Sequence, residues 1–496
     1  MIPLHLVGEF IKLKGEHMKK DTKLKISFIG GNAYDVTGSA TLIEWNDRHI
    51  LLDCGLIQGG TTLQDYKDNR NMLTKNKFKK IDTVIIGERH ADHSCNIPYI
   101  TKVSPECRVI TPLHTKEIFK CMFEDSAKIA ERDCELLHKK YEDRIFIPNY
   151  NLSDVDNCLD RIEEYPVGER IQIDDDIRVK FSYSGHIFGC CQTELWINVN
   201  GKEKHLLYTA DLGNILNQEN RPFTEELQRI ESATLVISES TYGARQKKQC
   251  TKKTIAKDLE KMYSVIEQYT IDLKSRVLIP TFSLDRTPAM LYMIWKKFKD
   301  NPRFKDVKVL VDSPLANRLL DVYLKELPKE KQELLAEILS WNNIIRITTP
   351  EESKYAMENY KSCVIVASSG MCNIGRSKMW LMKMLPNAED CVLFSGYCGT
   401  NTLGYKIKNH KQKYITIDGK AYPNRCNIIS ILGQSSHIQR NELIDYLSSI
   451  NSQKICLVHG EMNGRIELAE DLKEALANKS KTTTVCVVNK DTRISL

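Results

Sequence analysis

Two histidines and two carboxylates crowd into six residues at the point where an apolar segment of this chain ends. Residues 84–86 (Val-Ile-Ile) predict a buried strand, and Glu88-Arg89-His90-Ala91-Asp92-His93 follows almost directly. Imidazole nitrogens and carboxylate oxygens are the ligands that hold Zn²⁺ or Mn²⁺ in proteins. A strand end keeps such side chains rigid and leaves a metal open to solvent, so the run predicts a metal site. A polar loop that is rich in histidine by accident is the alternative for these six residues alone.

The composition predicts a globular protein of two or three domains. The chain has 496 residues, more than the roughly 100–200 of one domain, and a hydrophobic share of 42% supplies ample core. No apolar run of about 18 residues predicts a membrane span, and residues 1–20 are too polar for a secretory signal. The 16 cysteines show no C-x-x-C spacing, so we expect reduced thiols and a cytoplasmic location. The net charge of +6 permits a polyanionic partner without demanding one.

The strand pattern changes along the chain. Asn200-Gly201 separates two apolar strands and indicates a hairpin, because this pair accepts the positive φ of a type I′ turn. From about residue 244 strands alternate with helices, which is typical of a parallel sheet with covering helices. We expect strands at 24–30, 40–45, 48–53, 178–183, 277–279, 307–311, 364–367, 391–394, 454–458 and 483–488, and helices at 115–141, 287–298, 441–447 and 464–477. No Pro/Gly linker interrupts the chain, which favours a domain inserted in another.

Three further metal-capable side chains follow apolar strands. His186 lies in Ser-Gly-His, Asp211 comes two residues before a glycine, and His459 is followed by one. Glycine lets the backbone approach a cofactor closely. A lone histidine at a strand end is more commonly a hydrogen-bonded structural residue, but four such places in one chain favour a shared metal centre.

In these segments the sequence resembles the metallo-β-lactamase fold hydrolases, and specifically the β-CASP RNA-processing nucleases, a group that includes the cleavage-and-polyadenylation endonuclease and its bacterial relatives. The resemblance runs from about residue 23 to 488. The matching segments are 36–39, 51–59, 88–93, 186, 211, 239–243, 280–286, 312–316, 369–376, 402–404, 435–437 and 457–461. It implies an α/β fold, an αββα sandwich with an inserted parallel-sheet β-CASP domain. The implied domains are residues 1–243 and 426–496 for the sandwich and 244–425 for the insertion.

The resemblance also implies a metal-dependent ribonuclease with two divalent ions, Zn²⁺ or alternatively Mn²⁺, that activate a water for attack on single-stranded RNA. One ion would be held by His90 and His186, the other by Asp92, His93 and His459, with Asp211 bridging them. Asp92 would accept the water's proton and Asp53 would orient the site. His437 would be the general acid, held by Glu239. RNA phosphates would contact Ser283, Arg286, Ser369, Gly370 and Arg376.

The chain departs from the family at several positions. Glu88 stands where the family has its first metal-loop histidine. As a ligand, Glu88 would add negative charge and favour Mn²⁺ over Zn²⁺. Alternatively Arg89 or a nearby lysine would draw Glu88 away and leave a one-metal or inactive site. Asp285 replaces a glycine, Ile374 another glycine, and Met379-Trp380 a His-His pair of many bacterial members, which bears on substrate choice.

Other functions fit less well. The sequence has neither G-x-S-x-G nor G-x-x-x-x-G-K-[ST], which disfavours a serine hydrolase and a P-loop NTPase. The roughly 180-residue insertion disfavours a small-molecule hydrolase. His459 disfavours the DNA-specific branch of the family, because the matching position in that branch resembles valine. The remaining rival is a catalytically weakened RNA-binding scaffold subunit. We expect RNA as partner, no membrane, and a homodimer or a related β-CASP subunit.

Overall fold

Two mixed sheets lie face to face in the computed structural model, which describes residues 23–75, 78–244, 250–396, 398–399, 402–409, 412–431 and 433–496. The first sheet runs β22 (Arg493–Ser495), β1 (Lys25–Gly30), β2 (Ser39–Trp45), β3 (Arg48–Leu52), β4 (Thr83–Ile85), β5 (Arg108–Pro112) and β6 (Ile162–Tyr165). The second runs β21 (Thr484–Val487), β20 (Asn451–Leu457), β11 (Ser232–Ser238), β10 (Lys202–Tyr208), β9 (Cys191–Val199), β8 (Ile177–Tyr183) and β7 (Arg170–Asp174). The segment at 1–20, expected not to be a signal, lies outside the described residues.

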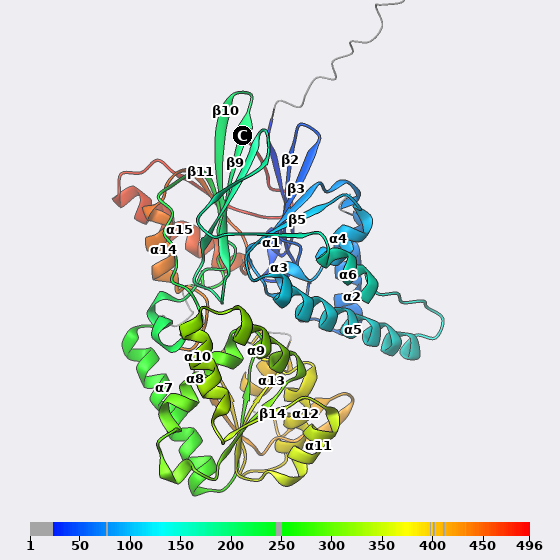
Figure 1. Cartoon of the computed structure of the whole chain (residues 1–496), viewed down its shortest axis with the longest axis vertical. Helices are drawn as coiled ribbons and strands as arrows, with labels where there is room; N and C mark the ends of the chain where they lie inside the picture. The colour runs from blue at the N-terminus through cyan, green and yellow to red at the C-terminus, as the bar shows by residue number, and fades with distance from the viewer. Residues whose placement is uncertain are drawn as a thin grey trace, which may run out of the picture.

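Apolar side chains from both sheets form one core between them. Phe28 and Leu52 of the first sheet share this core with Phe181 and Ile237 of the second. Helices cover the two outer faces (Figure 1). They are α2 (Thr62–Lys75), α4 (Ile97–Val103), α5 (Lys116–Lys140) and α6 (Leu152–Leu159) on the first sheet, and α14 (Arg440–Ser449) and α15 (Met462–Asn478) on the second. This arrangement confirms the predicted αββα sandwich.

A third sheet forms the second body of the molecule, in the lower half of Figure 1. Its strands are parallel, in the order β14 (Ile344–Ile347), β13 (Lys308–Asp312), β15 (Cys363–Ala367), β12 (Arg276–Pro280), β16 (Cys391–Phe394) and β19 (Asn427–Ser430). Its helices are α7 (Lys252–Ile266), α8 (Arg286–Phe298), α9 (Pro314–Glu326), α10 (Lys329–Ser340), α11 (Pro350–Asn359), α12 (Gly375–Met384) and α13 (Leu403–Asn409). β12 and β15 are buried along their whole length, as strands covered on both faces are.

Short elements complete the chain. They are α1 (Gly31–Tyr34), α3 (Ala91–Ser94), the hairpin β17 (Tyr414–Ile417) and β18 (Lys420–Pro423), the 3₁₀ turns η1 (Phe78–Lys80), η2 (Ile215–Asn220) and η4 (Pro302–Phe304), and the π-helical η3 (Glu267–Asp272). At the predicted hairpin turn Asn200 and Gly201 have φ values of 54° and 80°, as a type I′ turn requires. No helix among the described residues is long and apolar enough to span a membrane.

The inserted body is packed firmly against the sandwich. Phe119 of α5 belongs to the same apolar cluster as Leu319 and Tyr323 of α9. An ion pair of 2.6 Å joins Arg318 of α9 to Glu124 of α5. β19 pairs with β16, so the inserted sheet extends to residue 430, beyond the expected boundary at 425. The division into domains stays a prediction, with this later second boundary.

The carboxyl ends of several strands meet at the edge of the sandwich that faces the insertion. The metal loop (residues 88–93) follows β4, His186 follows β8, Asp211 follows β10, and His459 follows β20. Because these strands share a direction at this edge, the loops that follow them come together. The expectation that strand ends carry the site residues therefore has a structural basis in the sheet order.

The loops that follow β8 and β10 approach so closely that one of them needs a glycine. A Cβ on Gly213 would lie 1.8 Å from the carbonyl oxygen of Gly185. The Gly213 backbone N–H also donates to the Ser184 carbonyl at 2.9 Å, which holds the two loops in register. Any side chain here must push the loop of Asp211 away from the loop of His186.

We therefore expect Gly213→Ala to lower the free energy of unfolding by about 2–3 kcal/mol, the usual effect of overpacking. Gly396→Ala is the control, because an added Cβ there meets nothing within 4 Å. Chemical denaturation of both variants measures the difference. Equal stability of the two variants would contradict the close packing of these loops.

Candidate metal centre

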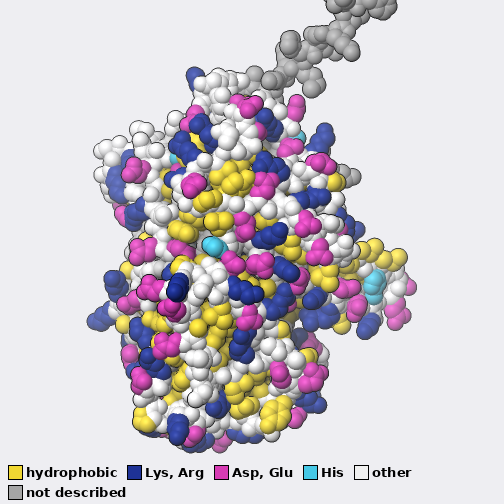
Figure 2. Space-filling view, viewed as in Figure 1, with side chains coloured by type: hydrophobic (Ala, Val, Ile, Leu, Met, Phe, Trp, Pro, Cys, Tyr) yellow, Lys and Arg dark blue, Asp and Glu magenta, His cyan; other side chains and the backbone are white. Residues whose placement is uncertain are grey.

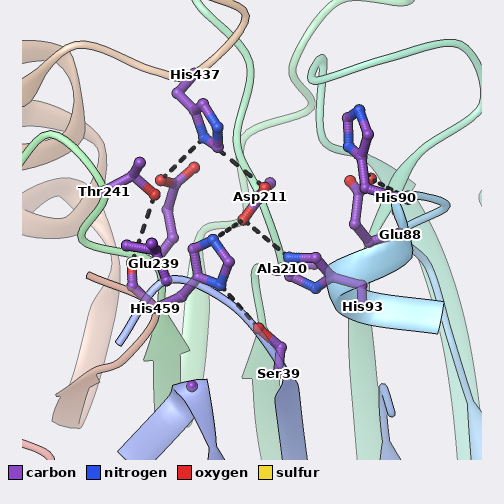
Figure 3. Close-up of polar contacts among 12 residues, drawn as sticks. Ser39, Glu88, His90, His93, Ala210, Asp211, Glu239, Thr241, His437 and His459 are labelled. Carbon is purple, nitrogen blue, oxygen red and sulfur yellow. Dashed lines mark hydrogen bonds and ion pairs between the residues drawn. The ribbon is translucent and has the colours of Figure 1, made fainter. Parts of the chain in front are cut away.

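The carboxylate of Asp211 lies at the centre of the site and is 2% exposed. Its Oδ1 is 3.3 Å from the Nε2 atoms of both His93 and His459. Its Oδ2 is 3.6 Å from His186 Nε2 and 3.8 Å from His437 Nδ1. Figure 3 shows His93, His437 and His459 converging on Asp211 from separate loops. One carboxylate thus contacts four imidazoles that the sequence brings from four distant places.

The candidate ligands near Asp211 fall into two groups. Within each group the ligand atoms lie within 4.8 Å of one another. The groups are Glu88, His90 and His186, and Asp92, His93 and His459. This is the division that the resemblance implied. His437 forms a further group with His186 and Asp211, so it borders the first set rather than lying apart.

The two histidines nearest Asp211 Oδ1 are held from behind. His93 Nδ1 is 2.6 Å from Asp53 Oδ2, and the Tyr208 hydroxyl donates to the same oxygen at 2.7 Å. Ser39 Oγ is 2.8 Å from His459 Nδ1. These contacts fix both rings with Nε2 toward Asp211, the arrangement that metal-binding histidines commonly have. Asp53 was expected to orient the site, whereas sequence reasoning missed Tyr208 and gave Ser39 no role.

The metal loop is tied to the segment that follows β3. The Cys54 N–H donates to the His93 carbonyl at 2.7 Å, and the Leu56 N–H donates to the Ala91 carbonyl at 2.8 Å. Between them Gly55 lies so close that a Cβ would be 1.6 Å from the Asp92 carbonyl oxygen. This close backbone contact explains why Asp53 is followed by a glycine two residues later.

Several buried polar atoms at the site have no hydrogen-bond partner among the described residues. They are Glu88 Oε2, His93 Nε2 and Asp211 Oδ1. Leaving such atoms unsatisfied costs about 1–3 kcal/mol each, and divalent cations bound in the two groups would satisfy them. The donor set of imidazole and carboxylate, three to a group, suits a catalytic metal with an open position. The residues therefore fit divalent metal ions.

Glu88 is fully buried and points into the first group. Its Oε1 accepts hydrogen bonds from the backbone N–H of Arg89 and of His90, and lies 2.9 Å from His90 Nδ1. Burial alone would raise the pKa of Glu88, but His186 and His90 hold that pKa well below its usual range. The lowered pKa favours the anionic carboxylate, which lies beside His90 and His186.

The alternative in which the Arg89 side chain draws Glu88 away is wrong. The guanidinium donates to the carbonyls of Phe188 and Leu113 and to Thr115 Oγ1. Among the described residues no lysine forms an ion pair with Glu88, whose partner is His90. Glu88 thus stays with the ligand group.

His437 reaches the site through a backbone pairing. The Ile438 N–H donates to the Leu212 carbonyl at 2.8 Å, next to Asp211. Glu239 Oε2 lies 3.4 Å from His437 Nδ1, and Glu239 Oε1 accepts the Leu212 N–H. Burial lowers the pKa of His437, but Asp211 and Glu239 outweigh it and raise that pKa to about 9. These carboxylates favour the protonated imidazole, which can donate a proton.

The expected RNA contacts lie at the carboxyl ends of the inserted strands. Ser283 Oγ is 2.7 Å from Ser368 Oγ, beside Ser369 and Gly370. Arg286 begins α8 and donates to the Ser395 carbonyl at 3.3 Å. These expected RNA contacts and the candidate metal ligands are connected through intermediate residues.

Arg376 is less available than we expected. Its side chain is 12% exposed, and its Nε lies 3.4 Å from Asp312 Oδ1. Asp312 also accepts hydrogen bonds from Ser353 and from Trp380, one of the positions that departs from the family. A phosphate would have to compete with this buried carboxylate for Arg376.

Comparisons with known proteins agree with this geometry. A family model described as the Beta-Casp domain matches residues 287–407, and one described as the Zn-dependent metallo-hydrolase RNA specificity domain matches residues 421–483. "Ribonuclease TTHA0252" of Thermus thermophilus is 27% identical over 439 residues, which cover 87% of this chain and 92% of that protein.

More distant relatives extend over nearly the whole chain. "Transcription termination factor FttA" of Methanocaldococcus jannaschii is 24% identical over 492 residues, covering 95% of this chain and 73% of that protein. A crystal structure of a protein of unknown function from Enterococcus faecalis V583 has a TM-score of 0.52 at 13% identity, over 96% of this chain and all of that one, and shares the fold alone. The chain therefore contains a Beta-Casp domain and a Zn-dependent metallo-hydrolase RNA specificity domain, and it is similar to a ribonuclease over most of its length.

Proposed function

We propose that this protein is a metal-dependent ribonuclease that hydrolyses phosphodiester bonds of single-stranded RNA. The single observation that carries the proposal is the buried Asp211 carboxylate among four imidazoles, with the His437–Glu239 pair beside it. The RNA specificity domain over residues 421–483 supports the substrate class, and the printed name of the Thermus relative supports the activity. A cytoplasmic location and pairing with a second copy or a related subunit stay predictions.

Divalent ions would be held by the two groups already described. Asp211 would serve both, because its carboxylate lies 3.3 Å from His93 and His459 and 3.6 Å from His186. Bound there, such ions polarise a phosphodiester and lower the pKa of a bound water. We favour two ions, with Zn²⁺ or Mn²⁺ as their identity. Asp53 and Ser39 keep the rings of His93 and His459 aligned for this task.

The proton transfers fall to side chains of the chain itself. Asp92 would accept a proton from the attacking water. His437 would give a proton to the leaving oxygen, and Glu239 would hold its Nδ1 side while Nε2 faces the substrate. The His437 side chain is 23% exposed and so open to a substrate, whereas Glu239 is buried at 1%. The more exposed His437 would contact RNA, whereas the buried Glu239 would only orient His437.

RNA would lie along the junction between the sandwich and the insertion. On the face in Figure 2, lysine and arginine side chains mix with aspartate and glutamate rather than gathering in one patch. Because this face has no single basic patch, binding there would depend on a few placed groups. We assign the turns at Ser283 and at Ser369-Gly370, with Arg286 and secondarily Arg376, to the phosphates.

Replacing Asp211 with Ala should remove most of the bound metal, because one carboxylate serves both ligand groups. Elemental analysis after dialysis measures the metal content. Asp445→Ala, at a position 59% exposed, is the control and should retain the wild-type content. Full metal content in the Asp211 variant would contradict the central role of this carboxylate.

Replacing Glu88 with His should increase the preference for Zn²⁺ over Mn²⁺ and leave ribonuclease activity equal or higher, because imidazole suits Zn²⁺ and carboxylate suits Mn²⁺. Competition between the two metals, followed by elemental analysis, gives the preference. Glu88→Gln keeps the size without the charge and should weaken binding of both metals. Unchanged metal binding in both variants, together with an inactive wild type, would favour the weakened RNA-binding scaffold.

Replacing Arg286 with Ala should weaken binding to unrelated single-stranded RNAs alike and reduce the salt dependence by about one unit of slope, as loss of one phosphate contact does. Arg376→Ala should have the smaller effect, because Asp312 already engages that guanidinium. Fluorescence titration at several salt concentrations measures both slopes. An effect confined to one RNA sequence would point to another role for Arg286.

A further inference from the structure

A buried ion pair joins the sandwich to the inserted domain beside the metal ligands. Arg221 comes from the segment that follows Asp211 and η2, and Asp285 directly precedes α8 of the insertion. Arg221 NH2 lies 3.4 Å from Asp285 Oδ2, with the side chains 3% and 5% exposed. Neither residue belongs to the ligand groups or to the proton-transfer pair, so the proposed chemistry leaves this ion pair without a role.

The Arg221 guanidinium also holds two catalytic loops through their carbonyls. It donates to the Gly185 carbonyl at 3.2 Å and to the His186 carbonyl, both in the loop after β8. It donates to the Ser436 carbonyl at 3.4 Å, in the loop that carries His437. The rings of His186 and His437 lie 4.5 Å apart. One side chain therefore contacts the backbone at or next to both histidines.

The hydrogen bonds from Arg221 to these carbonyls depend on Asp285. A guanidinium that donates to neutral carbonyls in a buried place carries an uncompensated charge unless a carboxylate lies beside it. Asp285 supplies that carboxylate from the other domain. Without it the guanidinium would be drawn toward solvent, and the two loops would lose their common anchor.

The backbone of Asp285 indicates that its carboxylate is kept for a reason. Its φ is 60° and its ψ is −55°, in the left-handed region that favours glycine. Here a side chain is retained despite the strain, and its carboxylate contacts Arg221.

We propose that Arg221 and Asp285 are a positioning pair that sets His437 for proton donation to the leaving oxygen and ties this geometry to the RNA-binding turn of residues 283–286. The inference rests on the acid role given to His437 in the proposed function. It adds a physical link from the turn that would bind RNA to the group that would act on it. Arg221 and Asp285 act through the backbone of other residues and do not touch the substrate.

The test compares two substrates in the metal-loaded full chain. RNA has a poor leaving group that needs a proton, whereas bis(p-nitrophenyl) phosphate has one that leaves without it. Asp285→Gly relieves the backbone strain and removes the carboxylate, and Asp285→Asn keeps a side chain that tolerates the same φ. Arg221→Lys keeps the charge but cannot reach three carbonyls.

We expect all three variants to lose about tenfold to a hundredfold in kcat on RNA, the effect of a small misplacement of a catalytic group. Their rate on bis(p-nitrophenyl) phosphate should stay within about twofold of the wild type, because the metal ligands are left in place. Metal content by elemental analysis should be unchanged. This pattern separates loss of the acid from damage to the metal centre.

Two further variants are the controls. Glu124→Gln breaks another ion pair between the domains, at 2.6 Å from Arg318 and away from the site, and should leave both rates unchanged. His437→Ala should impair RNA cleavage selectively, as the positioning variants do. If His437→Ala lowers both rates equally, the acid role fails and the inference fails with it.

If His437→Ala is selective but the Asp285 and Arg221 variants retain the wild-type kcat on RNA, the inference alone is overturned and the proposed function stands. If these variants lose metal or both activities together, the pair supports the fold rather than the acid, which also overturns the inference.

Discussion

A buried carboxylate surrounded by four imidazoles is the constraint on which this architecture depends. Asp211 is 2% exposed and lies within 3.8 Å of nitrogen atoms from four histidines. An ordinary core would not tolerate so many unsatisfied polar groups. Two sheets that present their strand ends at one edge bring the groups together while the apolar core between the sheets stays intact. The fold thus separates the part that supplies stability from the part that would hold metal.

Glu88, in place of the histidine that the resemblance implied, changes the charge of the metal loop while its side chain stays among the candidate ligands. In place of an imidazole the chain has a fully buried carboxylate, held by two backbone N–H groups and by His90. The neighbouring Arg89 is also buried, and its guanidinium donates to backbone carbonyls. Glu88 therefore stays within the group of candidate ligands, and we expect it to affect the choice of metal more than the integrity of the site.

The sequence was sufficient to predict the fold and the strand ends that carry the candidate ligands, because both depend on local patterns. Apolar strands ending in Asp53, His93, His186, Asp211 and His459 could be read along the chain, and Asn200-Gly201 marked a turn that has the expected positive φ values. The order of these segments, compared with a known family, then indicated which of them meet. The β19 strand was not expected, because its four residues gain their strand identity only by pairing with β16.

Contacts between residues far apart in the sequence could not be predicted in the same way. Tyr208 donates to Asp53 across 155 residues, and Ser39 lies beside His459 across 420. Arg376 looked like a free basic residue, and only the packed structure places Asp312 next to it. The Arg221–Asp285 pair was equally hidden, since neither residue has a local pattern that names its partner. Such contacts depend on the whole fold, so a local pattern cannot disclose them.

The most direct test of this account is X-ray diffraction from crystals grown with Zn²⁺ or Mn²⁺, measured at the absorption edge of each metal. The account predicts anomalous peaks on both sides of Asp211, one beside Glu88, His90 and His186 and the other beside Asp92, His93 and His459, with ligand distances of about 2.0–2.2 Å. Peaks that are absent from both positions, or an ion bound without Asp211, would contradict it.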